Sequence, residues 1–580
     1  MAHKIDSRLF FLLGLLALGL WLVNGSNQLI MQPSVAIAQS SSPLPTPTTQ
    51  SADAYPAPQF FPTPSPLQPI VWDRLPVCNN KPLKAGAWLG YLQGSAKDQP
   101  TSDALNSLYV RQLRQLSSAM TTLNDLTDLY VLLSISDDNP LLGQVLRRDL
   151  ALLWLNLIDG RLNRATEIVL PSLIETKTIG ALIDQIELAL QQKQPSKLLI
   201  QAVSELWSRR SITNPICAHF TFVQQSDWRL QSLLWTSQGI STSQSLRNTV
   251  GGAMFGLHPA PNYRTLAIET IGATVLLDVA AGRFSDLLND MNQRYSKRYS
   301  YATYQLVSGA NSDWSWEVLG WHPDSQQLLL GVAESGGGFW VNLHQHIYYP
   351  IYLADDVETT STTMNMTLSP NGQRLLYVNR HYVTAEQQQP GQSLELYELQ
   401  NGQQTTLLQM PEANDIDKRG RILYPRFSPD GKRIAFLVES GQPFVNLTYT
   451  LRLFDLTTKT QQVLLQGDFG WTEPVWSPDS QRIAFAWKDI DSDPNRYATP
   501  QGELWRGNIW TISPTTGDLR QITFIDGAAR VPIWSLDGRY IAFWTHDGQW
   551  GFTSTAHPGL IWQLSEPIVR PRVASAAYLP

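Results

Sequence analysis

The chain has 580 residues, which is enough for more than one domain. Its 43 Lys and Arg residues against 49 Asp and Glu residues give a formal net charge of −6, and no basic run stands out, which argues against a nucleic-acid-binding protein. Only 16% of the residues are charged whereas 20 are tryptophan, a composition that suits an all-β protein with aromatic cores.

Residues 1–38 have the layout of an export signal. Lys4 and Arg8 precede an apolar stretch over residues 9–23, and Ala36-Ile-Ala38 is a small-x-small cleavage motif. The apolar stretch is short for a membrane span, but it lies unusually far from the cleavage motif, so a retained membrane anchor is the alternative. We therefore expect a periplasmic or extracytoplasmic protein, either released or anchored in the inner membrane.

Residues 39–72 are predicted to be a linker. The stretch 43–69 contains nine prolines mixed with Ser and Thr. Such a composition favours extended polyproline II structure and no packed core, so the segment is expected to be a spacer ahead of the folded part.

Residues 73–245 are predicted to be a helical domain. Pro140, preceded by Asn139, indicates a helix start with asparagine as the cap and proline in the first turn. The domain could be a plain bundle that packs on the rest of the chain, or an array of helical hairpins that binds a peptide, and we favour the bundle. Apolar residues recur at helical spacing in this range, for example at Leu105, Leu108, Leu113 and Leu116.

The chain has two cysteines, Cys78 and Cys217, one near each end of the helical domain. An even cysteine count in an exported protein favours a disulfide, which would join the two ends of that domain. The alternative is two separate buried thiols.

Residues 246–580 contain a repeated unit. Phe427-Ser-Pro-Asp-Gly-Lys-Arg-Ile-Ala-Phe is one clear copy, with a strand before the Ser-Pro-Asp-Gly turn and a buried strand after it. Two more strands follow at regular distances, and four antiparallel strands per repeat of this length predict a propeller blade. The copies begin at Leu257, Trp321, Leu368, Phe427, Trp476 and Trp534.

The fold class is therefore multidomain, an N-terminal all-α bundle followed by an all-β six-bladed propeller. The first copy is degenerate, because Leu257-His-Pro lacks the Asp-Gly turn. His258 and His322 occupy the Ser position of the motif and are expected to bond within their turns. Blade six can be completed within the chain, and the sequence leaves open whether a strand from before Met254, such as His219–Gln224, closes the ring instead.

The repeat resembles the WD-like repeats of the TolB family of periplasmic propellers, over roughly residues 250–566. The same repeat occurs in propellers attached to prolyl-oligopeptidase-type peptidases. TolB proteins carry an α/β domain ahead of the propeller, where this sequence predicts helices. The resemblance therefore implies a propeller but does not carry over that family's partners, the peptidoglycan-associated lipoprotein and the Tol complex.

One loop has the alternating oxygen ligands of a calcium site. Asp489, Asp491 and Asp493 occur at every second position, but Pro494 stands where an EF-hand needs glycine. We favour a plain acidic loop, with calcium as the alternative, and expect no other cofactor.

A peptidase of the related class needs a Gly-x-Ser-x-Gly nucleophile motif, which this sequence does not contain. Few residues follow Glu566, so we expect no hydrolase domain. The sequence thus predicts a non-catalytic exported scaffold that binds envelope proteins. The alternatives are a propeller enzyme or a sugar- or peptide-binding protein that uses the central channel, and a membrane-anchored sensor.

Overall fold

The computed structural model describes residues 82–98, 106–207, 212–214, 216–224, 229–236, 239–242, 246–247, 254–270, 273–279, 281–287, 316–332, 337–345, 347–352, 362–381, 391–410, 420–441, 448–469, 472–488, 507–525, 528–545, 550–556, 558–559, 561–563 and 576–579. Residues 67–580 form one compact unit. The predicted signal, the linker and Cys78 lie outside the described residues, as does the side chain of Cys217.

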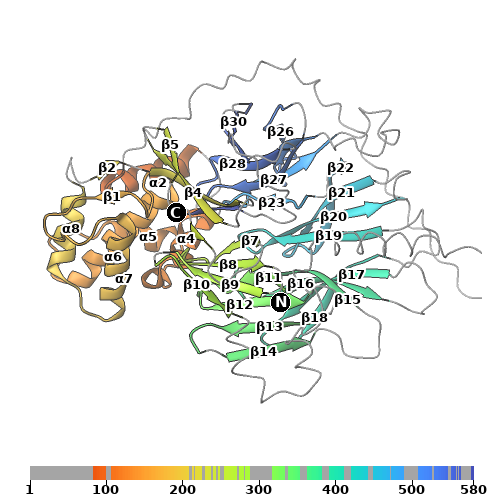
Figure 1. Cartoon of the computed structure of the whole chain (residues 1–580), viewed down its shortest axis with the longest axis horizontal. Coiled ribbons are helices and arrows are strands. Elements are labelled where there is room, and N and C mark those ends of the chain that lie inside the picture. Colours follow the sequence, from red (N-terminus) through yellow and green to blue (C-terminus); the bar gives the residue numbers. More distant parts are fainter. Residues whose placement is uncertain are drawn as a thin grey trace, which may run out of the picture. The chain divides into compact units, whose positions relative to one another are not determined.

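Helices occupy most of the described residues between 85 and 206 (Figure 1). Side-chain caps begin three of them, because Asp125, Thr178 and Ser196 accept hydrogen bonds from amides in the first turns of α5, α7 and α8. The elements are α2 (Ala85–Asp98), a π-helical turn η1 (Asn106–Val110), α4 (Arg111–Leu116), a 3₁₀ turn η2 (Ser118–Met120), α5 (Leu126–Leu133), α6 (Leu142–Ile158), α7 (Ile179–Gln191) and α8 (Lys197–Leu206).

The start of α6 differs from the prediction. The helix begins at Leu142, and Asn139 Oδ1 accepts a hydrogen bond from Leu141 N at 2.9 Å. Asn139 therefore forms a local turn ahead of the helix, and Pro140 precedes the first turn. Short strands β1 (Glu167–Ile168) and β2 (Ile212–Asn214) pair beside the helices.

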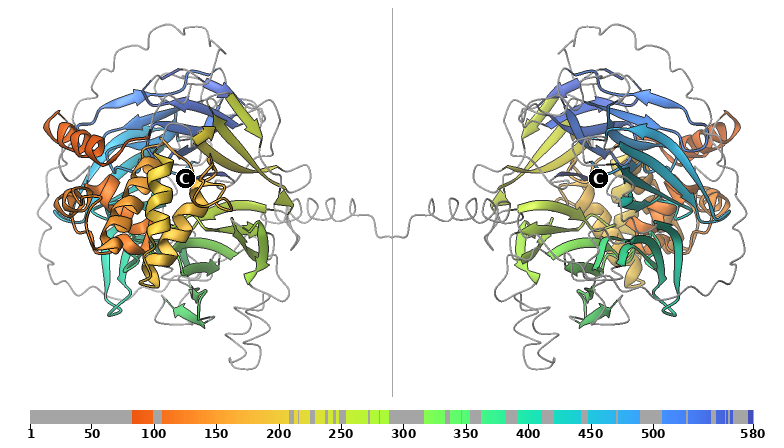
Figure 2. Two further views of the ribbon diagram at one scale, coloured as in Figure 1. Left: turned by 90° about the vertical axis from the view of Figure 1, so that its left-hand side faces the viewer. Right: turned by 90° about the vertical axis from the view of Figure 1, so that its right-hand side faces the viewer.

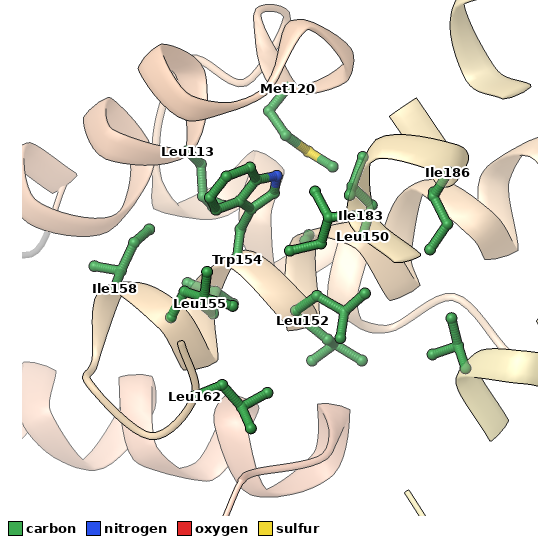
Figure 3. Packing of buried hydrophobic residues seen from close by; sticks show 14 of the residues in the cluster. Leu113, Met120, Leu150, Leu152, Trp154, Leu155, Ile158, Leu162, Ile183 and Ile186 are labelled. Carbon is green, nitrogen blue, oxygen red and sulfur yellow. The ribbon is translucent and has the colours of Figure 1, made fainter. Parts of the chain in front are cut away.

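These helices share one hydrophobic core, and α6 runs through it. From Val145 onward nearly every residue of α6 is buried. Figure 3 shows the Trp154 ring among Leu113, Met120 and Ile183, which come from three other elements. Burial on all sides explains why the apolar residues of α6 extend beyond a single helical face.

Six four-stranded antiparallel sheets follow within the described residues, and each is formed by consecutive strands. The six-bladed, TolB-like propeller predicted from the repeat is thereby confirmed. The blades are β7 (Met254–Pro259), β8 (Thr265–Thr270), β9 (Ala273–Asp278) and β10 (Arg283–Asp286); β11 (Trp316–Trp321), β12 (Gln327–Val332), β13 (Gly337–Asn342) and β14 (Ile347–Tyr352); β15 (Thr362–Leu368), β16 (Arg374–His381), β17 (Gly391–Glu398) and β18 (Gln404–Met410); β19 (Gly420–Phe427), β20 (Arg433–Ser440), β21 (Thr448–Asp455) and β22 (Thr460–Gly467); β23 (Val475–Trp476), β24 (Ile483–Trp487), β25 (Asn508–Ile512) and β26 (Leu519–Gln521); and β27 (Ala529–Trp534), β28 (Tyr540–Thr545), β29 (Trp550–Ser554) and β30 (Ile561–Gln563).

A further sheet joins strands from both ends of the folded part. Its order is β31 (Ala576–Leu579), β3 (Ile216–Gln224), β4 (Arg229–Thr236) and β5 (Gly239–Thr242), and β6 (Leu246–Arg247) also pairs with β4. We call it the closing sheet, because β31 lies against both β27 of the sixth blade and β7 of the first. The range His219–Gln224 therefore does help to close the ring, beside six blades that are complete in themselves.

Strands β3 to β5 lie within residues 73–245, the range predicted from sequence to be a helical domain. Phe220 and Phe222 stack on each other on one side of β3, and Phe220 packs on Trp550 and Phe552 of the sixth blade. This period-two pattern is that of a strand, so the last part of the range is β-structure.

The first strand of each blade lies next to the propeller axis. First strands of neighbouring sheets contact one another, as β11 and β15 or β15 and β19 do, and the later strands extend outward (Figure 2). Every first strand of a blade ends in the turn that carries the repeat motif. The motif turns of all six blades therefore gather at one end of the axis, which we call the turn end.

The motif turns have the bonding that their sequence predicts. Asp430 Oδ1 accepts from Ser428 Oγ at 2.5 Å and from Lys432 N at 3.1 Å, and Ser428 Oγ accepts from Arg433 N at 2.9 Å. His322 bonds within its turn as expected, since its Nδ1 accepts from Asp324 N at 3.3 Å. His258 does not, because its Nε2 lies 3.1 Å from Glu269 Oε1 on the neighbouring strand β8.

Candidate functional site on the fourth blade

Most first strands contain a β-bulge for which the repeat motif gives no sequence signal. In β7, β11, β15, β19 and β27 the pairing register shifts immediately before the first residue of the repeat. A bulge increases the local twist of a strand and redirects its side chains. Five axial strands are thus bent at the same place, close to the axis.

The bulge of β19 contains a strained residue. Tyr424 has a φ of 51°, in the left-handed region that bulky residues rarely adopt. Val531 in the bulge of β27 has the same φ of 51°. Such backbone conformations cost free energy and are found preferentially at functional sites, so these bulges mark candidate positions for a site.

A row of polar side chains crosses the fourth blade beside this bulge. Glu439 on β20 stands opposite Arg421 on β19 and opposite Tyr449 on β21. Arg421 Nη1 lies 3.4 Å from Glu439 Oε1. Glu439 and Tyr449 are both only 4% exposed, so this part of the row is covered by protein.

A second ion pair lies at the junction with the fifth blade. Arg426 donates from Nε and Nη2 to Glu473 Oε2 at 3.1 and 2.7 Å. The two side chains are 33% and 37% exposed, so both remain accessible to solvent. This pair is the most accessible part of the site, whereas Glu439 is buried and Arg421 is half-buried.

Tyr424 connects the two pairs electrostatically. Burial raises its pKa, and Glu473 and Glu439 add to that effect while Arg421 and Arg426 oppose it. Burial likewise raises the pKa of Tyr449, with Glu439 and Asp468 as further causes. Both phenols are therefore neutral at neutral pH and available as hydrogen-bond donors. We call Arg421, Tyr424, Arg426, Glu439, Tyr449 and Glu473 the blade-four cluster.

The blade-four cluster suits recognition of a polar, charged ligand. Its guanidinium groups can bind a carboxylate or a carbonyl oxygen, and its carboxylates can bind an ammonium group. The sequence analysis did not single out these residues. The repeat explains only the turn and core positions, and the row is visible only once the strand register is known.

The side chains proposed from sequence for metal binding and disulfide formation lie outside what the structure describes. Asp489, Asp491 and Asp493 lie outside the described residues, so calcium binding there stays a prediction. The Cys78–Cys217 disulfide stays a prediction for the same reason. Among the described residues no group of three or more His, Cys, Asp or Glu side chains could hold a metal ion.

Two curated proteins that match part of the chain are named peptidases. The chain is 29% identical over 131 residues to "Uncharacterized peptidase YuxL" of Bacillus subtilis and 28% identical over 158 residues to "Dipeptidyl-peptidase 5" of Porphyromonas gingivalis. These matches span 22% and 27% of this chain but only 18% and 20% of the relatives. No protein-family model matches the chain.

Solved structures show weaker likenesses. TolB from Acinetobacter baumannii is 14% identical, with a TM-score of 0.31 and coverage of 69% of this chain and 73% of that one. The tricorn protease is 10% identical, with a TM-score of 0.40 and coverage of 61% and 36%. The propeller assignment rests on the strand pairing of this chain.

The curated relatives contradict two predictions from the sequence. Both relatives are named peptidases, whereas the sequence analysis predicts a non-catalytic scaffold that is not an enzyme. That prediction relied on a missing nucleophile motif and on where the chain ends, and neither observation concerns the propeller. The alternative, a propeller enzyme or peptide-binding protein, agrees better with the relatives.

No helix among the described residues is long and apolar enough to cross a membrane. The apolar stretch 9–23 lies outside the described residues.

Proposed function

We propose that this chain acts in peptide hydrolysis and that its propeller binds the peptide substrate at the blade-four cluster. The match of the chain to two relatives named as peptidases carries the proposal. The cluster supplies the binding chemistry, since it joins solvent-accessible charges of both signs to a strained axial bulge.

The role of each group follows from its exposure and charge. Glu473 is accessible and can accept from the ammonium group of a peptide or from its backbone N–H groups. Arg426 can donate to a carboxylate or a carbonyl oxygen beside it. Arg421 and Glu439, which are more buried, would hold β19 in its bulged conformation and keep Tyr424 in place.

Three further proposals accompany this function. The helices between Ala85 and Leu206 would form an all-α bundle, supported by their common core. The chain would be exported through residues 1–38 and reach an extracytoplasmic location. Envelope proteins remain its proposed partners.

The test uses the purified full chain with a panel of fluorogenic peptides and a fluorescein-labelled peptide for binding. We expect Glu473→Gln to weaken binding about tenfold or more, because a charge-assisted hydrogen bond contributes about 1.5–3 kcal/mol. The matched control is Asp518→Asn, since Asp518 is also paired with an arginine and is 40% exposed but lies on the outer part of the fifth blade.

The outcomes separate the alternatives. Hydrolysis of peptides by the wild-type chain supports a peptidase, and binding without hydrolysis supports a peptide-binding protein. A wild-type chain that neither binds nor cleaves any peptide contradicts the proposal. Equal affinities of Glu473→Gln and Asp518→Asn would show that the peptide does not bind at the blade-four cluster.

A further inference from the structure

The helical part of the chain contacts the turn end of the propeller. Arg539, which follows the motif turn of the sixth blade, donates to Asp159 O at 2.8 Å and to Asp159 Oδ1 at 2.9 Å. Asp159 is the C-cap residue that directly follows α6. Next to it, Gly160 packs so closely on Asp537 that a Cβ on the glycine would lie 2.5 Å from Asp537 Oδ2.

The helices make a further contact with the turn of the sixth blade and also contact the turn of the first blade. Gln112 Nε2 donates to Leu536 O at 3.4 Å, again in the turn of the sixth blade. In the turn of the first blade, Arg264 Nη2 bonds Asp184 Oδ1 of α7 at 2.6 Å, and Tyr263 packs against the helical core. Turns on both sides of the closing sheet are therefore covered.

Arg111 extends the contact of the helices to the turn of the fifth blade. It is the first residue of α4, and its Nη2 bonds the carbonyl oxygen of Pro478 in the turn of the fifth blade. Burial lowers its pKa to about 10, against the opposing influence of Asp430, Tyr263 and Asp479. These three residues belong to the turns of the fourth, first and fifth blades. With Gln112 bonding Leu536 O, the start of α4 contacts the motif turns of both the fifth and the sixth blade.

The blade-four cluster extends along β19 away from the turn end. Its accessible pair, Arg426 and Glu473, lies near the motif turns of the fourth and fifth blades. β19 runs from Gly420 to Phe427 and then enters its turn, so Arg421 lies at the end of the strand away from the turn. Its partner Glu439 is the penultimate residue of β20, again far from the turn. The helical contacts and the far part of the cluster therefore lie at opposite ends of the axis.

We propose that the helical part is a cap that closes the turn end of the propeller axis, so that a peptide reaches the blade-four cluster only from the opposite end. The route of the peptide rests on the proposed function, whereas the cap itself does not. Peptide entry would then depend on a single end of the propeller.

The first test concerns the cap alone and needs no peptide. Gly538 N and Gly517 N each donate to a serine carbonyl in a turn, at 2.9 and 2.8 Å. Gly538 lies in the turn beneath the helices, whereas no atom lies within 4 Å of the Cβ position of Gly517. In hydrogen exchange of the full chain, we expect the amides around Gly538 to be at least about tenfold more protected. Equal exchange rates of the amides around Gly538 and Gly517 would contradict the proposal that the helices cap the turn end.

The second test loosens the cap. Gly160→Ala adds a methyl group against Asp537 at a residue with a φ of +64°. Its control is Gly517→Ala, which has a φ of +72° and so a similar backbone cost, but open space around it. Arg111→Met, which keeps the volume and removes the charge, is an independent second variant.

Stopped-flow measurement of the association and dissociation rates of the labelled peptide tests from which end of the propeller it enters. Opening a second entrance should raise the association and dissociation rates together by roughly tenfold while leaving Kd unchanged. Unchanged rates in Gly160→Ala and Arg111→Met, with exchange showing an uncovered turn end, overturn the inference. A wild-type chain that binds no peptide refutes the proposed function instead, and the exchange measurement still decides the cap.

Discussion

One position of the motif turn shows how a single residue serves both the turn and its neighbour. Glycine occupies it in three copies, where Gly372, Gly431 and Gly538 have φ values of 72°, 71° and 68°. Ser325 and Ser480 occupy it in two others, with φ values of 59° and 63°. A serine in this conformation is strained, so its presence needs another explanation.

The serine hydroxyls explain it. Ser325 Oγ accepts from Asn262 N at 2.9 Å, and Ser480 Oγ accepts from Asp430 N at 3.1 Å. In both cases the donor lies in the turn of the preceding blade. At this position the backbone strain of serine is therefore offset by a hydrogen bond between successive blades.

This exchange predicts an order of stabilities at Ser480. Ser480→Ala keeps the strained φ and loses the hydrogen bond, so we expect a loss of about 1–2 kcal/mol. Ser480→Gly also loses the bond but relieves about 1 kcal/mol of strain, so it should be close to the wild type. Denaturant unfolding of both variants checks the order. An alanine variant as stable as the glycine variant would show that the serine backbone carries no strain.

The leading tryptophans have a similar double role. Trp476 and Trp534 donate from Nε1 to Arg426 O and Val475 O, at 3.2 and 3.1 Å. Each acceptor lies on the first strand of the preceding blade. The sequence predicts the bulk of these rings in the core, but their hydrogen bonds depend on which blades are neighbours, which the repeat alone does not show.

At the scale of the strand, features that depend on adjacent residues could be predicted from the sequence, whereas features that depend on the pairing of separate strands could not. Ser-Pro-Asp-Gly predicts its turn and Ile434-Ala-Phe predicts its buried strand, because both depend on adjacent residues. The bulge with Tyr424 has no such signal, because its conformation is imposed by pairing with β20. The row of Arg421, Glu439 and Tyr449 likewise needs the register of three strands.

The closing sheet is the clearest case of a distant contact. β31 pairs with β3 from His219–Leu579 to Phe222–Ala576, so the register joins segments more than half the chain apart. Neither segment carries the repeat motif. Only the alternation over Phe220 and Phe222 indicates a strand, and the sequence analysis accordingly left its partner open.

This pairing predicts that β31 matters more than its length suggests. A chain that lacks Ala576–Pro580 would leave β3 as an unpaired edge between two blades, with its backbone groups unsatisfied. We expect a large loss of thermal stability, together with aggregation through the open edge. The control is a chain that lacks Pro580 alone, which keeps the whole of β31. If both shortened chains have the same melting temperature as the wild type, β31 does not hold the ring closed.

At the scale of the whole folded unit, two sets of cores are joined by mainly polar contacts. The helical core is centred on Trp154, and among the described propeller-blade residues Tyr263 packs against it. The blades have their own cores between neighbouring sheets, such as that around Ile434 and Phe436. Polar contacts between separate cores are typical of domains that retain some independence.

This organisation predicts two melting transitions in calorimetry of the full chain, each governed by its own core. Ile183 and Ile434 are both 0% exposed, the first on α7 and the second on β20. Replacing either by alanine should cost about 2–5 kcal/mol through lost burial and the cavity left behind. We expect Ile183→Ala to lower one transition and Ile434→Ala the other. If both variants lower one common transition instead, the cap and the propeller unfold as a single cooperative unit, and the cap could then open only by unfolding with the ring.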